Sequence, residues 1–106
     1  MLHRNLFIFF LIVFSMIVSV ASADVGTARG KSLSGMCVDC HGDNGLGDED
    51  IPAIAGLESA YIRDALLNFK SGSRIDENED MAEIAPMLTD RNIADLATYY
   101  SMLPGK

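Results

Sequence analysis

Apolar residues recur at helical spacing in two long stretches of the chain. In residues 57–70 they stand four positions apart, at Leu57, Tyr61, Ala65 and Phe69, with Ile62 and Leu66 beside them. In residues 90–103 the spacing is i, i+3, i+4 and i+7, at Ile93, Leu96, Ala97 and Tyr100, and Leu103 continues the stripe. Such spacing places apolar side chains on one face of a helix. Thr89 or Asp90 is suited to be the N-cap of the second helix.

Two shorter helical segments complete the predicted set. Residues 26–37 fit a first helix with Ala28, Leu33 and Met36 as apolar positions, and residues 81–85 fit a short helical turn. The segments 43–52 and 76–80 are polar loops, and no stretch alternates as a β-strand would. The chain is therefore predicted to be all-α, with three main helices. Loops this long in so small a domain indicate that they wrap something.

The N-terminus has the pattern of an export signal. His3 and Arg4 precede an almost unbroken apolar stretch from Leu6 to Val20, which small residues follow at 21–23. An apolar core of about fifteen residues is shorter than the roughly twenty that span a membrane. Residues 1–23 are therefore predicted to be a cleaved secretory signal peptide and residues 24–106 one periplasmic domain. An uncleaved membrane anchor is the alternative.

The charge of the exported part limits its partners. Residues 24–106 carry seven basic and fifteen acidic residues, a formal net charge of −8, with the densest acidic runs at 48–50 and 76–80. Nucleic acid is a poor partner because phosphate binding relies on Lys and Arg. A basic protein partner is one expectation, and an acidic surface that only keeps the protein soluble is the other. A domain this small often depends on a disulfide, metal or cofactor for stability.

The main chemical motif is Cys37-Val-Asp-Cys40-His41. A structural zinc site needs four ligands, and residues 24–106 contain no further Cys or His. A thioredoxin-like dithiol needs a βαβ pattern that the chain does not show. Attachment of c-type haem explains all three residues, because two thiols form thioethers and the adjacent histidine binds the iron. Cys37 and Cys40 are therefore predicted to hold one haem c, with His41 as axial ligand; a haem-free thiol–disulfide protein is the alternative.

A sixth iron ligand is expected to be a methionine sulfur. Met81 and Met87 both lie in the loop that could cross the far face of the haem, so the residues alone leave both open. Met36, beside the attachment motif, and Met102, at the end of the last helix, are predicted to serve in packing, which is the commoner role of methionine.

With these motifs the chain resembles the small bacterial class I cytochromes c over residues 30–103. The matching residues are Cys37-Val-Asp-Cys40-His41-Gly42, Pro52-Ala-Ile-Ala-Gly56, Tyr61, Phe69-Lys70-Ser71-Gly72, Met81, Leu88-Thr89-Asp90 and Leu96-Ala-Thr-Tyr99. Within that family it is similar to the periplasmic monohaem and dihaem carriers and to the cytochrome subunit of flavocytochrome c sulfide dehydrogenase. The resemblance implies a class I cytochrome c fold wrapped around one covalently attached haem.

The resemblance also implies residue roles. In the family the methionine ligand stands seven residues before the apolar position that precedes the helix cap, here Leu88, which favours Met81 over Met87. The carbonyl of Pro52 is expected to accept the N–H of His41, a contact that orients the ligand.

The same resemblance implies a helix contact. Gly30 and Tyr99 are expected to form the contact between the first and last helices. Separately, Tyr61 and Arg74 are candidates to reach the haem propionates, with surface exposure as the alternative for Arg74.

The function implied is electron transfer, with the iron cycling between Fe(III) and Fe(II). No nucleophile–base pair is visible in the sequence, so the chain is expected to be a carrier and not an enzyme. Its partners would be a redox donor and acceptor. The alternatives are a haem-bearing subunit that works with a flavoprotein, as in a sulfide dehydrogenase, and a haem-based gas sensor or peroxidase with Met81 absent from the iron.

Overall fold

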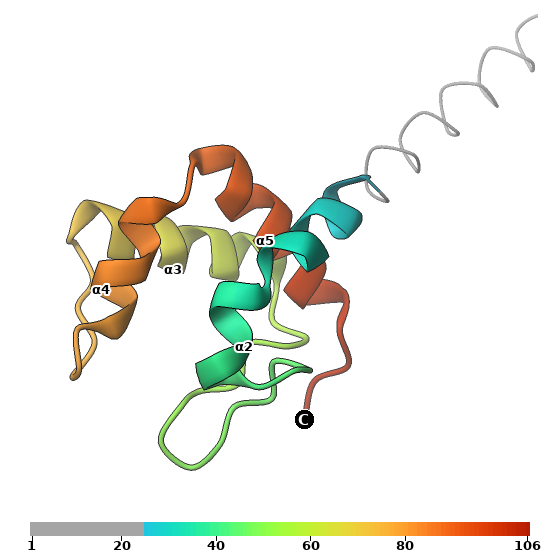
Figure 1. Cartoon of the computed structure of the whole chain (residues 1–106), viewed down its shortest axis with the longest axis horizontal. Helices are drawn as coiled ribbons and strands as arrows, with labels where there is room; N and C mark the ends of the chain where they lie inside the picture. The colour runs from blue at the N-terminus through green and yellow to red at the C-terminus, as the bar shows by residue number, and fades with distance from the viewer. Residues whose placement is uncertain (1–24) are drawn as a thin grey trace, which may run out of the picture.

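The computed structural model describes residues 25–106, so the predicted signal peptide, residues 1–23, lies outside the described residues. Residues 25–33 are helical, and the later elements are α2 (Gly35–His41), α3 (Ser59–Ser71), α4 (Asp80–Ile84), the 3₁₀ helix η1 (Ala85–Met87) and α5 (Asp90–Met102) (Figure 1). Residues 25–106 contain no strand, in agreement with the predicted all-α class. In the same range, no helix has the length and apolar character needed to cross a bilayer.

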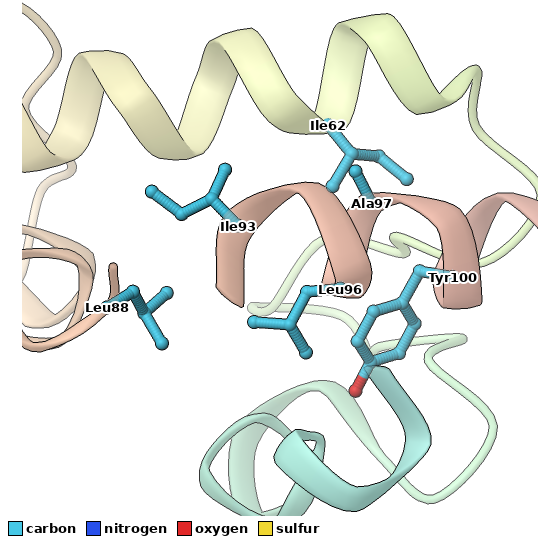
Figure 2. Packing of buried hydrophobic residues seen from close by; sticks show 6 residues of the cluster. All are labelled: Ile62, Leu88, Ile93, Leu96, Ala97 and Tyr100. Atoms are coloured by element: carbon cyan, nitrogen blue, oxygen red, sulfur yellow. The ribbon is translucent and has the colours of Figure 1, made fainter. Parts of the chain in front are cut away.

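Helices α3 and α5 pack together and form the core. The core cluster consists of Ile62, Leu88, Ile93, Leu96, Ala97 and Tyr100. Figure 2 shows Ile93 and Ala97 on the side of α5 that faces α3, whereas Leu96 and Tyr100 extend toward α2. The apolar stripe predicted for the last helix is therefore buried, and it serves two contacts.

Local capping fixes the start of α5 and the end of α3. Thr89, one of the two predicted caps, accepts a hydrogen bond on its hydroxyl from the Asn92 N–H at 3.0 Å, and the Asn92 side chain accepts the Thr89 N–H at 3.0 Å. This reciprocal pair is a capping box. Helix α3 ends at Gly72, whose φ of +83° suits glycine.

The first predicted helix differs from the observed one. A turn at Ser34 interrupts it, and α2 then continues to His41 instead of ending at residue 37. The Ser34 hydroxyl donates to the Lys31 carbonyl at 2.7 Å, and the Ser34 N–H donates to the same oxygen at 3.2 Å. Such local side-chain bonds compete with regular helix bonding. As a result the whole attachment motif lies on one short helix.

The N-terminal helix crosses α5 at very short range (Figure 1). A Cβ on Gly30 would overlap the carbonyl oxygen of Asp95 and lie 2.5 Å from the Tyr99 Cβ, so the predicted contact between Gly30 and Tyr99 is confirmed. Gly26 is also buried, whereas Ala28, predicted as an apolar contact, is exposed. Glycine is required at position 30 because the two backbones approach too closely there for any side chain.

An ion pair between a buried carboxylate and a partly exposed guanidinium, which the sequence pattern does not reveal, lies at the same crossing. The Asp95 side chain is 7% exposed, and its carboxylate accepts a hydrogen bond from Arg29 Nε at 2.8 Å, with Arg91 Nε at 3.6 Å. The hydrogen bond from Arg29 to Asp95 raises the pKa of Arg29. Buried carboxylates require such partners, so Arg29 allows Asp95 to sit inside the helix crossing.

Candidate cofactor site

A cavity of about 390 Å³ lies between α2, α3, α4 and the loop that follows α2. This volume is in the usual range of small-molecule sites. Its lining is mainly apolar, and it includes all five predicted site residues, namely Cys37, Cys40, His41, Pro52 and Met81. The fold thus brings together residues from positions 37 to 81 of the chain.

Helix α2 presents the attachment motif to this cavity. Cys37 is partly buried, Cys40 is exposed and both are free thiols. Residues three apart share a helix face, so the two sulfurs line the cavity together with His41. Burial raises the pKa of the Cys37 thiol. Within residues 25–106, no group of three or more His, Cys, Asp and Glu side chains is placed to hold a metal ion.

His41 is held in one orientation by Pro52. The imidazole is 8% exposed, and its Nδ1 lies 2.9 Å from the Pro52 carbonyl oxygen. A carbonyl can only accept, so Nδ1 carries the proton and Nε2 keeps its lone pair. This tautomer and a carbonyl partner on the other nitrogen are typical of metal-binding histidines.

A compact loop delivers the Pro52 carbonyl. Asp48 accepts the N–H groups of Asp50 and Ile51 on one carboxylate oxygen, both at 2.8 Å. The bond from Ile51 and, to a smaller extent, the bond from Asp50 stabilise the charged carboxylate and so lower the pKa of Asp48. Gly47 has φ +64°, and a Cβ there would lie 2.7 Å from the Pro52 carbonyl carbon. Asp48 therefore organises the loop. In the sequence it stands in the acidic run 48–50, which gives no indication of this role. The signal that could have indicated it is the Gly-Asp pair, which is typical of such turns.

The four methionines considered as ligands differ in environment. Met81 lies partly buried in the cavity lining, and its N–H donates to an Asp76 carboxylate oxygen at 3.3 Å. Met87 is 66% exposed and lies outside the lining. Met36 is 39% exposed but lines the cavity beside Cys37. Met102 is 64% exposed, so the predicted packing role is wrong there: it lies off the buried stripe of α5.

Helix α3 supplies one wall of the cavity. The predicted stripe Leu57, Tyr61, Ala65 and Phe69 lines it, so this face contacts the cavity as well as the core. Tyr61 is 55% exposed. The Arg74 guanidinium lies over the Phe69 ring, 4.8 Å from its centroid, and both Tyr61 and Arg74 border the cavity.

The donor set fits a covalently attached haem. Two thiols lie on one helix beside a histidine of fixed tautomer, a thioether lies elsewhere in the same lining, and the remaining walls are mainly apolar. These are the groups by which proteins tether haem and bind its iron. The fold and site define a c-type cytochrome.

Comparison with known proteins agrees with this assignment. Residues 27–103 match the cytochrome c family, and the chain belongs to that family. It is 37% identical over 76 residues to cytochrome c-554(548) of Halomonas halodenitrificans, covering 70% of this chain and 92% of that protein. It is 38% identical over 82 residues to the cytochrome subunit of sulfide dehydrogenase of Chlorobaculum tepidum, covering 77% of this chain and 73% of that protein.

A solved structure has the same fold. The reduced cytochrome c4 from Pseudomonas stutzeri superposes with a TM-score of 0.71 at 26% identity, covering 76% of this chain and 50% of that chain. This chain therefore spans about half the length of that protein. The predicted class I cytochrome c fold, the covalently bound haem c and the electron-transfer function are confirmed.

Proposed function

We propose that this chain is a periplasmic electron carrier in which Cys37 and Cys40 tether one haem c and His41 and Met81 bind its iron. The observation that carries the proposal is the shared cavity, which these four residues line together. Haem supplies one-electron chemistry between Fe(III) and Fe(II), and a thioether ligand favours the reduced state.

The surrounding residues support these roles. Pro52 fixes the His41 ring through the 2.9 Å contact, which directs Nε2 away from the loop. Asp76 ties down the backbone of Met81 through the bond to its N–H. The assigned residues bind and orient a redox group and do not form a nucleophile–base pair. We therefore assign transport of electrons, and not catalysis, to this chain.

The domain limits and location belong to the same proposal. Residues 1–23 would be the cleaved signal peptide and residues 24–106 the mature cytochrome. Two facts support export: the family match begins at residue 27, and c-type haem attachment in bacteria takes place outside the cytoplasm.

Covalent haem attachment can be tested directly. Wild-type protein recovered from the periplasm of a host with haem-attachment machinery is expected to give a pyridine haemochrome spectrum with one haem per chain, retained after denaturation. A Cys37→Ala/Cys40→Ala variant should lose the haem on denaturation, because no thioether remains. Asp39→Ala, at an exposed position between the cysteines, is the control and should retain it. Colourless wild-type protein with a reversible Cys37–Cys40 disulfide would instead support the thiol–disulfide alternative.

The partner we propose is a basic redox protein. Four acidic residues border the haem cavity, at Asp50, Asp76, Glu77 and Asp80. Ile75, also in the lining, is 71% exposed and offers an apolar contact at the same place. Opposite charge accelerates association. A flavoprotein subunit is the second candidate, because one relative is the cytochrome subunit of a sulfide dehydrogenase.

Docking at this acidic border predicts a salt-dependent rate. Electron transfer with a basic redox protein is expected to slow severalfold from low to physiological ionic strength, because salt screens exposed charges. An Asp50→Asn/Glu77→Gln variant should start slower and respond less to salt. Asp43→Asn/Asp64→Asn removes the same charge from exposed positions outside the cavity lining, and it should retain more of the wild-type salt response. A rate indifferent to salt, or equal effects of both double variants, would contradict docking at this border.

A further inference from the structure

Tyr100 carries a buried hydroxyl that the protein itself does not satisfy. The residue is 2% exposed, and its hydroxyl has no hydrogen-bond partner among residues 25–106. Its ring belongs to the core, and Figure 2 shows the side chain leaving α5 with the hydroxyl directed at α2. Buried polar groups nearly always have a partner. The hydroxyl is therefore expected to gain its partner when haem is attached in the neighbouring cavity.

The residues around Tyr100 limit which groups could be the hydrogen-bond partner of its hydroxyl. Tyr100 and Cys37 both line the haem cavity, and Cys37 packs against the cluster that contains Tyr100. Burial is the main cause of the raised pKa of Tyr100, and Cys37 raises it further, whereas Ser34 lowers it. The Ser34 hydroxyl donates its proton to the Lys31 carbonyl, so toward Tyr100 it could only accept, and the Tyr100 hydroxyl makes no such bond. The hydroxyl thus lies at the end of the cavity where Cys37 would form its thioether with the haem.

The chemistry of haem selects the acceptor at that end. Thioethers form on the two vinyl groups, while the two haem carboxylates lie at the opposite edge of the macrocycle. A hydroxyl beside Cys37 therefore faces the tether edge, where the polar acceptor is the tether sulfur. We propose that Tyr100 is a positioning residue whose hydroxyl donates a hydrogen bond to the Cys37 thioether sulfur. This inference rests on the proposed attachment of haem through Cys37.

The bond has a redox consequence. A donated O–H points the positive end of its dipole at the haem edge, and the buried position of Tyr100 keeps that dipole from being screened by solvent. Positive potential there stabilises the reduced haem, which carries one positive charge fewer than the oxidised haem. Hydrogen bonds around haem are one of the means by which a protein sets its potential. Tyr100 therefore raises the reduction potential and restrains the tether.

The test compares holo-protein carrying Tyr100→Phe with wild type. The equilibrium constant for reduction is expected to fall about threefold, which is about 28 mV at 59 mV per tenfold change for one electron. The resonance Raman C–S stretching bands should also shift. Tyr99→Phe is the matched control, because Tyr99 is the next residue of α5 and its ring lies 5.0 Å from that of Tyr100. It should leave the C–S bands unchanged.

Several outcomes would overturn the inference. The first is a Tyr100→Phe protein that holds haem and matches wild type in potential and C–S bands. The second is a potential change that depends on pH with unchanged C–S bands, which would place the hydroxyl on a titrating haem carboxylate. If the variant does not assemble, deuterium exchange of wild type must shift a C–S band, and no shift rejects the bond. Wild-type protein without haem would instead refute the proposed function.

Discussion

A Met81→Ala variant is expected to lose the weak near-infrared band of iron–thioether bonding and to bind carbon monoxide in its ferrous form. Met81 lines the cavity that also holds His41, and alanine has no atom able to bind iron. Because a thioether stabilises ferrous iron, the reduction potential should fall as well. A fall on the order of 0.1 V is expected, within the roughly 0.8 V span that axial ligands set.

Two other methionines serve as controls for this result. Met87→Ala should keep the band and the potential of wild type, since Met87 is 66% exposed and lies outside the cavity lining. Met36→Ala is the stricter control, because Met36 lines the same cavity. Persistence of the band in Met81→Ala would rule out Met81 as the ligand. Loss of the band in either control variant would identify that methionine instead.

A Gly30→Ala variant is expected to be among the most destabilising single changes in this protein. The added Cβ would overlap the carbonyl oxygen of Asp95 and lie 2.5 Å from the Tyr99 Cβ. Overpacking typically costs about 1–3 kcal/mol. Here the obstacle is backbone, which cannot rotate aside, so we expect a loss of about 3 kcal/mol in the free energy of unfolding of the holo-protein. Urea denaturation monitored by helical circular dichroism measures it.

Gly35→Ala provides the matched control. Gly35 is the first residue of α2, and a Cβ there would meet nothing within 4 Å. Replacing an unhindered helical glycine by alanine stabilises by roughly 0.5–1 kcal/mol. The two variants should therefore shift the urea midpoint in opposite directions. Equal shifts would show that Gly30 does not mark a close helix crossing.

Local patterns were enough to predict the main helices. The spacing from Ile93 to Tyr100 predicted the buried face of α5, and Thr89 was one of two predicted caps. These predictions succeed because periodicity and capping depend on residues within one or two turns of each other. The prediction of one unbroken helix over 26–37 failed at Ser34, where a side chain bonds to the Lys31 carbonyl, because helical spacing alone does not register such a bond.

The contacts between distant segments were much harder to predict. Asp95 is buried beside Arg29, 66 positions earlier in the chain, and in the sequence it resembles any exposed acid on a helix. Asp48 was counted in an acidic run, yet its carboxylate closes the loop before Pro52. In both cases the role depends on which backbone or cation lies within about 3 Å.

The sequence by itself determined the cofactor, because Cys37, Cys40 and His41 lie within five consecutive residues. Their spacing along the chain is enough to indicate haem attachment. The tertiary structure decided what surrounds that motif. It placed the Pro52 carbonyl on His41, Met81 rather than Met87 in the cavity lining, and the Tyr100 hydroxyl at the Cys37 end of the cavity. The physical reason is that covalent motifs depend on neighbours along the chain, whereas burial and orientation depend on how α3, α5 and the loops pack.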